Sequence, residues 1–286
     1  MRTRAFGGSL ADAQGIVEVD KSTFGGCTYT AEYICALESD PDRCVWLAEQ
    51  EGLIVGFVSA FPTHSLAANR WEVDELAVRP EAQGRGLGSE LVKCAVGEGE
   101  RRAGLSVARA LVAAHNGASQ RVFIKNGFAS IAAVDLLLYR VTGRVPRPPQ
   151  AGLPGVRDAR VGDADGIARL CGSAVEWVEW LIGRSGNMYS VVGEGAHVEG
   201  YMEMVSVRTL QYRGLWIESL AVSGGDQGVA LALFNAALER AKSDDTMDEV
   251  GSLVPTRESL LHAASVGEGF KKVGEYVTFA RELRTP

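Results

Sequence analysis

The stretch Leu76-Ala77-Val78-Arg79-Pro80-Glu81-Ala82-Gln83-Gly84-Arg85-Gly86-Leu87-Gly88-Ser89-Glu90-Leu91 predicts a strand, a glycine-rich turn and a helix in succession. Three glycines fall within five positions, so the backbone of the turn can approach a ligand with no Cβ in the way. A helix that begins after such a turn points its free N–H groups and the positive end of its dipole at that ligand. We therefore expect an anion, and a diphosphate in particular, to bind at this turn.

A second, less similar copy of this stretch follows 144 residues later. At that offset Leu76-Ala77-Val78 matches Leu220-Ala221-Val222, and Gln83-Gly84 matches Gln227-Gly228. An ungapped match across a strand and a turn indicates one domain that has been duplicated. The 286 residues are enough for two domains of ordinary size.

A proline-rich segment marks the boundary between the two copies. Four of the nine prolines fall within residues 141–155, which read VTGRVPRPPQAGLPG. Proline fixes φ and removes hydrogen-bond donors, which favours an extended spacer. We predict a first domain at residues 1–142, a linker at 143–155 and a second domain at 156–286.

Each half mixes helices with consecutive strands that can pair as antiparallel neighbours. In the first half the pattern predicts helices at 10–24, 30–37, 89–99 and 117–125, and strands at 44–49, 53–61, 71–78, 108–114 and 131–141. In the second half it predicts helices at 163–182 and 230–241, and strands at 156–159, 189–192, 197–207 and 216–222, with a last strand ending near residue 283. This order favours an α+β fold in which helices are layered on a mixed α/β sheet.

Composition and charge exclude several classes of function. The net charge is −7 and neither half is basic, which argues against nucleic-acid binding. No apolar run is long enough to cross a bilayer, and the N-terminus lacks the apolar region of a signal peptide. The five cysteines and four histidines show no metal-ligand spacing, so we expect reduced thiols, no metal and a cytoplasmic location.

Two motifs in this sequence resemble those of the GNAT superfamily, the acyl-CoA N-acyltransferases. The family's Gln/Arg-x-x-Gly-x-Gly/Ala motif corresponds to QGRGLG at residues 83–88. Its second motif corresponds to Asn116, Ser119, Phe123 and Gly127-Phe128 at the usual spacing. The resemblance implies two tandem GNAT-like domains, the second degenerate, and the architecture is similar to that of mycothiol synthase with no implication for the substrate.

The resemblance also implies that acetyl-CoA is the co-substrate and that the first domain binds it. Backbone N–H groups of the turn would hold the diphosphate, Arg85 would add charge, and the preceding strand edge would bind the pantetheine arm. Asn116 and Ser119 would line the thiol end, although Asn116 alone could instead be a helix N-cap. The implied residues are Leu76, Ala77, Val78, Gln83, Gly84, Arg85, Gly86, Leu87, Gly88, Ser89, Asn116, Ser119 and Phe123.

Phe123 departs from the family pattern, because a tyrosine commonly stands there and often protonates the leaving CoA thiolate. Phenylalanine has no proton to give, so another group or water would serve, or the thiolate would leave unaided. In the second half, Gly86 and Gly88 are replaced by Ala230 and Ala232. We therefore expect the second domain to complete the substrate cleft without binding CoA productively. The protein would then be a monomer whose two domains form a pseudo-dimer, or a weak homodimer.

The strand before the glycine turn offers three carboxylates, Glu72, Asp74 and Glu75. An amine must lose its proton before it attacks a thioester, and a carboxylate on this strand is the family's usual means. Strand alternation puts Glu72 and Asp74 on one face and Glu75 on the other. A bulge, common in this strand of the family, would reverse the facing, so all three remain candidates for the base.

These features predict an N-acetyltransferase that acetylates a primary amine of a small molecule by direct attack on acetyl-CoA. The acidic balance suits a cationic acceptor, and we expect neither nucleic acid nor membrane as a partner. One alternative is a protein or peptide N-acetyltransferase, which would need an open groove. The other is a CoA-binding module without catalysis, which the loss of tyrosine at Phe123 would allow.

Overall fold

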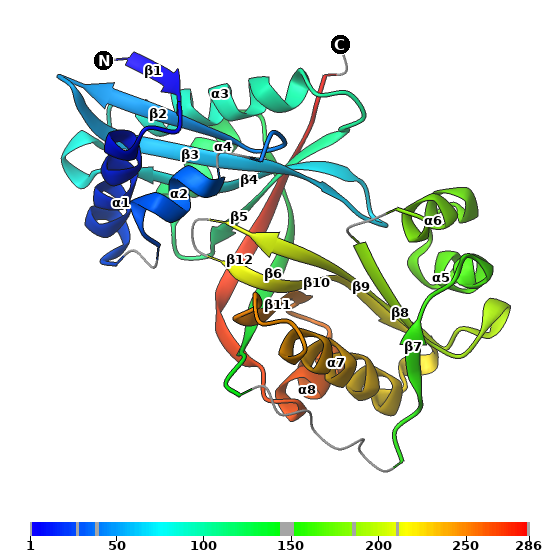
Figure 1. The fold of residues 1–286 in the computed structure, drawn as a ribbon. Coiled ribbons are helices and arrows are strands. Elements are labelled where there is room, and N and C mark those ends of the chain that lie inside the picture. The colour runs from blue at the N-terminus through cyan, green and yellow to red at the C-terminus, as the bar shows by residue number, and fades with distance from the viewer. Residues whose placement is uncertain are drawn as a thin grey trace.

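The computed structural model describes residues 2–26, 29–37, 40–143, 152–184, 187–209 and 212–284. In these ranges each half of the chain forms a sheet with helices on both faces, and the two halves share one continuous 12-stranded sheet (Figure 1). The mixed α/β layers predicted from the sequence are therefore confirmed. Most of the predicted linker, residues 144–151, lies outside the described residues.

In the first half, α1 and α2 cover one face of the sheet and α3 covers the other. Its elements are β1 (Arg2–Ala5), α1 (Leu10–Phe24), α2 (Ala31–Leu37), β2 (Cys44–Gln50), β3 (Leu53–His64), β4 (Asn69–Val78), α3 (Leu87–Glu100), β5 (Val107–Ala113), α4 (Gly117–Lys125) and β6 (Ala129–Arg140). Ile16 of α1 packs in one core with Phe57 and Ala77 of the sheet, whereas Leu91 of α3 packs in another core with Trp71. Strand β4 is therefore covered on both faces, which fixes its position at the centre of the first half.

The second half repeats this layering, with α5 and α6 on one face and α7 and α8 on the other (Figure 1). Its elements are β7 (Val156–Asp158), α5 (Ala164–Cys171), α6 (Val175–Ile182), β8 (Asn187–Val192), β9 (Gly200–Arg208), β10 (Arg213–Val222), α7 (Gln227–Lys242), β11 (Glu249–Pro255), α8 (Ser259–Gly267) and β12 (Lys271–Glu282).

Two features of the second half differ from the sequence prediction. The helix predicted at 163–182 is divided into α5 and α6, because Gly172 adopts the left-handed conformation (φ 75°) and caps α5. The segment between α7 and the last strand, to which the sequence analysis assigned no element, contains β11 and α8. These two elements are the counterparts of β5 and α4 in the first half.

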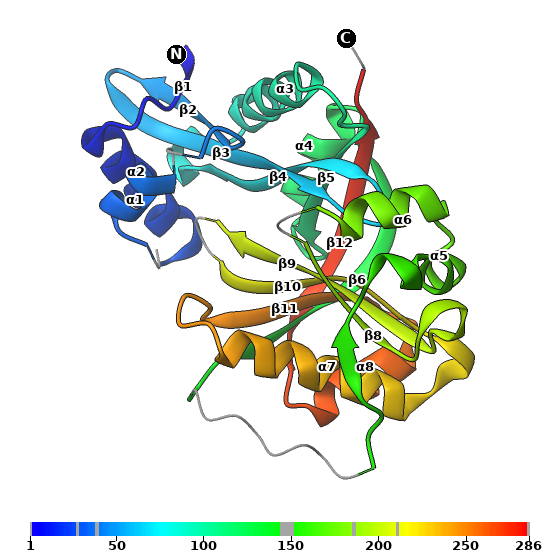
Figure 2. The ribbon, with the colours of Figure 1, turned by 45° about the vertical axis from the view of Figure 1, so that its right-hand side comes forward.

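The two halves exchange their last strands. The strand order is β1-β2-β3-β4-β5-β12-β6-β11-β10-β9-β8-β7. Strand β12 leaves the second half and pairs with β5, with Val277 opposite Val112, while β6 of the first half pairs with β11. Figure 2 shows β12 in red, running alongside β6 from α8 toward the C-terminus near α3. Each half thus completes its sheet with a strand that follows the other half's helices.

The β3–β4 turn of the first half is buried in the second half. Leu66 is 3% exposed and packs in the core formed with α5 and α6. Its N–H donates to the carboxylate of Glu203 at 3.1 Å, and Trp177 Nε1 donates to the carbonyl of Ser65 at 3.2 Å. The halves are therefore joined by side-chain packing as well as by the sheet.

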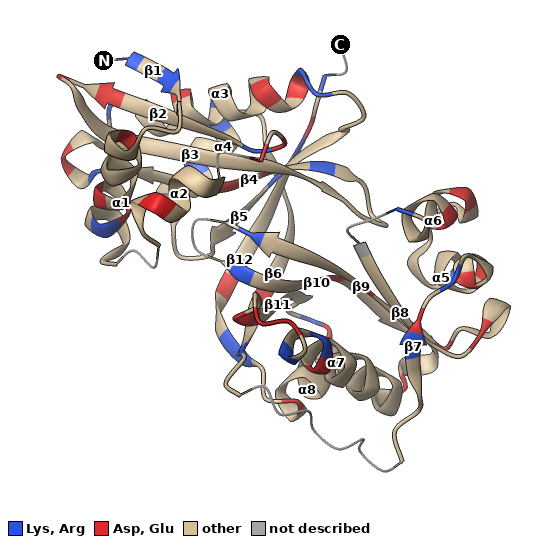
Figure 3. Cartoon of the chain, viewed as in Figure 1, with Lys and Arg blue, Asp and Glu red and all other residues tan. Residues whose placement is uncertain are grey.

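Charged residues of both signs are scattered over the two halves in Figure 3, with Lys and Arg interspersed among Asp and Glu. Among the described residues, no helix has the length and apolar character needed to span a membrane.

Candidate functional site

The glycine-rich turn ends at a helix start that no side chain caps. Gly84 and Gly86 have φ values of 74° and 84°, a region that favours glycine. Gly86 is the N-cap of α3, and α3 begins at Leu87 without a side-chain cap hydrogen bond. The N–H groups of the first helical turn have no partner within the helix. They form the kind of anion-binding end that the sequence predicted.

A cleft of about 380 Å³ lies beside this helix start, between α1, β4, the turn and α4. It brings together ten of the thirteen residues expected to bind the cofactor, namely Leu76, Val78, Gln83, Gly84, Gly86, Leu87, Gly88, Ser89, Asn116 and Ser119. Arg121 and Lys125 of α4 also line it. These two cations, which no sequence motif had indicated, supply positive charge near the turn.

The other three expected residues lie outside the cleft lining. Arg85 is exposed on the turn, and Ala77 faces the core under α1. Phe123 is 4% exposed and packs in the core against Phe128 and Phe279, with ring centroids 5.2 and 6.3 Å away. Asn116 combines both uses considered for it, because it lines the cleft and its Oδ1 caps α4.

The corresponding helix start in the second half is already occupied by a carboxylate of the chain. Asp226 is the N-cap of α7, and its Oδ1 accepts from the N–H groups of Gly228 at 2.8 Å and Val229 at 3.2 Å. Asp226 stands 144 residues after Ala82, so the cap is absent from the first half. The signal for it in the sequence was an aspartate directly before a helix, a common N-cap.

Strands β4 and β5 separate soon after they meet. Their parallel ladder contains only the pairs Arg70–Val107, Trp71–Ala108 and Glu72–Arg109. Beyond these pairs β5 is paired with β12 alone. Leu76 and Val78 of β4 face α3 and line the cleft, whereas Glu72 of β4 and Arg109 of β5 line a second cavity.

This second cavity, the chamber, has a volume of about 120 Å³ and is built by both halves. Its walls are mostly apolar, with Glu72, Asp74 and Arg109 from the first half and Glu218 from the second. The remaining lining residues are Phe61, Thr63, Val73, Leu111, Val205, Val207, Thr209, Tyr212, Trp216, Leu253 and Thr278. In the part of the chain that the structure describes, no group of His, Cys, Asp and Glu could hold a metal ion.

A β-bulge positions the acids of β4. Ser59 of β3 is opposite Glu75 and Ala60 is opposite Val73, so Asp74 is the extra residue of the bulge. Ser59 and Phe61 share a face of β3, and they lie opposite Glu75 and Glu72. All three acids therefore lie on one side of β4, where simple alternation would have separated Glu75.

The bulge recurs in the second half. In β10 the register shifts between Ile217 and Ser219, which leaves Glu218 as the extra residue. Glu218 stands 144 residues after Asp74, and both line the chamber. The chamber therefore lies between equivalent strands of the two halves.

Glu72 is held by two arginines. Its carboxylate accepts from Arg70 Nε at 3.1 Å and from Arg109 Nε at 2.8 Å. The same arginines donate to Glu218, which ties the halves together. Burial opposes ionisation of Glu72, but Arg109 and Arg70 outweigh it and lower the pKa of its carboxyl. A carboxylate held in this way is a poor proton acceptor.

Asp74 has the properties of a better proton acceptor. Its carboxylate is accessible from the chamber, accepts from Ser59 Oγ at 3.3 Å and is hydrogen-bonded by Thr209 of the second half. The side chain of Asp74 is open to the chamber, but the protein around it desolvates the carboxyl and raises its pKa to about 6, although Arg43 and these hydrogen bonds oppose the rise. Asp74 is therefore ionised at neutral pH and yet basic enough to accept a proton. Glu75 is 7% exposed and does not line the chamber.

Residues 14–128 match the model of the acetyltransferase (GNAT) family, whereas no curated protein sequence matches the chain. A GCN5-related N-acetyltransferase from Sphaerobacter thermophilus is similar in structure, with 17% identity, coverage of 100% of this chain and 98% of that chain, and a TM-score of 0.63. A putative acetyltransferase from Pyrococcus horikoshii has 14% identity, coverage of 100% and 91%, and a TM-score of 0.58. A tandem GNAT protein from the clavulanic acid biosynthesis pathway has 16% identity, coverage of 100% and 99%, and a TM-score of 0.56. The tandem GNAT fold expected from the two motifs is thus confirmed.

Proposed function

Starting from a GNAT acetyltransferase domain at residues 14–128, we propose that the protein is an N-acetyltransferase that transfers the acetyl group of acetyl-CoA to a primary amine of a small molecule. The observation that carries this proposal is that two cavities lie on opposite faces of the same sheet. A cleft with an uncapped helix start lies on one face of the sheet, and a chamber containing Asp74 lies on the other. Strand β4, which pairs with β5 only from Arg70 to Glu72, contributes residues to both cavities.

The cleft residues fit acetyl-CoA, which supplies an activated acyl group when bound. The N–H groups at the start of α3 would bind the diphosphate. Gly84 and Gly86 have no Cβ, which leaves room for the phosphates to approach the backbone. Arg121 and Lys125 would neutralise phosphate charge. Leu76 and the other apolar wall residues would contact the pantetheine arm. The carboxylate of Asp226 supports the proposal that the second half does not bind CoA.

Asp74 is the proposed general base. A primary amine is protonated at neutral pH, so the base must take its proton before the nitrogen attacks. Among the described residues, Asp74 is the chamber carboxylate that no arginine holds in an ion pair, whereas Glu72 and Glu218 are each held by Arg70 and Arg109. Ser59 and Thr209 would orient its oxygens toward the amine.

The walls that both halves contribute to the chamber favour a small acceptor over a peptide. Val205, Trp216 and Glu218 of the second half form part of its wall, and a volume of about 120 Å³ suits a compact molecule. A chamber carboxylate with a pKa of about 6 supports catalysis over CoA binding alone.

The direct test is thiol release from acetyl-CoA over a panel of small amines and peptides. Turnover with small amines supports the proposal. Turnover with peptides alone would favour protein acetylation, and CoA binding without turnover on any acceptor would favour a non-catalytic module.

Thr209→Val should move the acid limb of the pH profile of kcat/KM to higher pH by about one unit. Thr209 Oγ1 accepts from the N–H of Tyr212 at 3.0 Å, so its own proton is available to Asp74. Loss of this hydrogen bond destabilises the ionised carboxylate, which raises its pKa, and activity on the acid side then falls at a higher pH. Thr209→Ser keeps the hydroxyl and should keep the wild-type profile. If the acid limbs of wild type, Thr209→Val and Thr209→Ser coincide, Thr209 does not stabilise the ionised carboxylate of Asp74.

A further inference from the structure

Arg43 is a mostly buried arginine that uses few of its hydrogen-bond donors. It precedes β2, its side chain is 14% exposed, and its guanidinium lies 4.7 Å from the centre of the Phe61 ring. Its polar partner among the described residues is Asp40, whose Oδ2 is 3.4 Å from Arg43 Nε and whose side chain is 47% exposed. A guanidinium carries five N–H donors, so most of those on Arg43 remain available.

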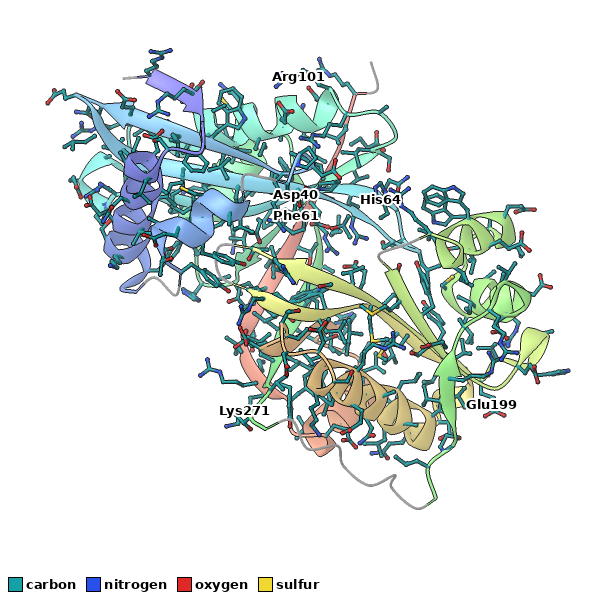
Figure 4. All side chains as sticks on the ribbon, viewed as in Figure 1. Asp40, Phe61, His64, Arg101, Glu199 and Lys271 are labelled. Atoms are coloured by element: carbon teal, nitrogen blue, oxygen red, sulfur yellow. The ribbon has the colours of Figure 1, made fainter. Side chains whose placement is uncertain are left out.

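Arg43 lines a mouth that adjoins the chamber. The mouth is a cavity of about 250 Å³ that shares Phe61, Thr63, Val205 and Val207 with the chamber. Asp40, Phe61 and His64, which line the mouth, are labelled in Figure 4 where the first half faces the second. Arg43 is also close enough to Asp74 to oppose the rise of its pKa. A molecule that enters through the mouth and reaches Asp74 therefore passes Arg43.

The other acids near this route already have cationic partners. Asp42 at the mouth is 3.6 Å from Arg102, and Glu72 and Glu218 in the chamber are held by Arg70 and Arg109. A ligand on this route can therefore meet the carboxylate of Asp74 and those donors of Arg43 that Asp40 does not use. Arg184 of the second half adds a second positive charge at the mouth, where it lies 4.8 Å from the ring of Trp180.

We propose that Arg43 binds a carboxylate of the acyl acceptor, and that the acceptor is an amino acid with an apolar side chain. The amino group would face Asp74 and the carboxylate would receive two N–H groups of Arg43, the bidentate geometry that a guanidinium favours. The side chain would pack on the apolar walls of the chamber at Phe61, Leu111 and Trp216. This inference rests on the proposed acetyl transfer and names its substrate class.

Matched substrates with and without a carboxylate test the proposal. The pairs are L-phenylalanine with 2-phenylethylamine, and L-leucine with 3-methylbutylamine. Wild-type enzyme should prefer each amino acid in kcat/KM. Arg43→Gln should raise KM for the amino acids about 100-fold and change KM for the amines less than about 3-fold. Arg43→Lys should fall between the two, because lysine keeps the charge and loses the bidentate geometry.

Arg101→Gln is the matched control, because Arg101 is 63% exposed and pairs with Glu98 on the surface of the first half (Figure 4). It should leave both classes of substrate unaffected. An equal loss on amino acids and amines in Arg43→Gln would overturn the proposal, since Arg43 would then act only through Asp74.

Equilibrium binding separates this proposal from the proposed function. If no acceptor is turned over, acetyl transfer to these amines is wrong, and calorimetry with L-phenylalanine in the presence of CoA still tests the carboxylate site. Binding that weakens in Arg43→Gln and persists in Arg101→Gln supports the site. Absence of binding to the wild-type protein, or equal binding to Arg43→Gln, overturns it.

Discussion

Asp74→Asn is expected to lower kcat by about 10²–10⁴-fold, because the amine would lose the group that accepts its proton. The affinity for acetyl-CoA should be unchanged, since Asp74 lines the chamber and not the cleft. Asparagine has nearly the same shape and can still accept from Ser59 and Thr209, so the local structure should persist. Steady-state kinetics on an acceptor from the amine panel, together with calorimetry for CoA, measure the two effects separately.

The pH dependence gives this variant a signature. The difference between Asp74→Asn and wild type should shrink as the pH approaches the pKa of the free amine, about 10, where a base is no longer needed. Asp165→Asn removes an exposed carboxylate of α5 that lines neither the cleft, the chamber nor the mouth, and it serves as the matched control, with wild-type kcat. Full turnover by Asp74→Asn, with loss in Glu75→Gln or Glu72→Gln, would assign the base to another of the three acids.

Gly86→Asp should weaken CoA binding at least about 1,000-fold. The new carboxylate would lie at the N-cap of α3, where it would occupy the free N–H groups as Asp226 does at α7 and would repel the phosphates. Gly86 has a φ of 84°, so any side chain also introduces backbone strain of about 1–2 kcal/mol. Calorimetry for CoA reports the binding, and thermal unfolding reports the strain.

Gly224→Asp is the control for the strain and the added charge. Gly224 also has a positive φ, 63°, precedes α7 in the second half, and has open space where a Cβ would lie. This variant should bind CoA as the wild type does while losing comparable stability. Equal losses of CoA affinity in both variants would mean that the second half also takes part in binding.

Local patterns predicted most individual elements but not how the halves share strands. Helix α1 has the bounds that its apolar spacing predicted, and the glycine turn is followed by α3 as expected. Strands β6 and β12 have alternating patterns that fit either sheet, and their pairing depends on contacts far apart in the sequence. The break at Gly172 was missed because one glycine within a helical pattern is often tolerated.

The candidate site was likewise predictable only in part from the sequence. The cleft residues were predictable because the turn is contiguous and its glycines have a direct physical reason. The chamber was not predictable, because Arg109, Thr209 and Glu218 come from separate segments. The one indication of the chamber in the sequence was that Asp74 and Glu218 stand 144 residues apart, at equivalent positions of the two halves. The choice among three acids required their partners, above all Arg109, which stands 37 residues after Glu72.

Because β12 and β6 are exchanged between the halves, the sheet of the first half cannot be completed until the second half has been synthesised. Until residues 271–282 have left the ribosome, β5 has no neighbour on the side that β12 will fill, and its open edge can recruit other chains. A polypeptide that ends early would contain the entire cofactor cleft in its sequence and still carry a divided sheet. Translation products that end before residue 271 should therefore fail to form the continuous sheet and be prone to association through the open edge of β5.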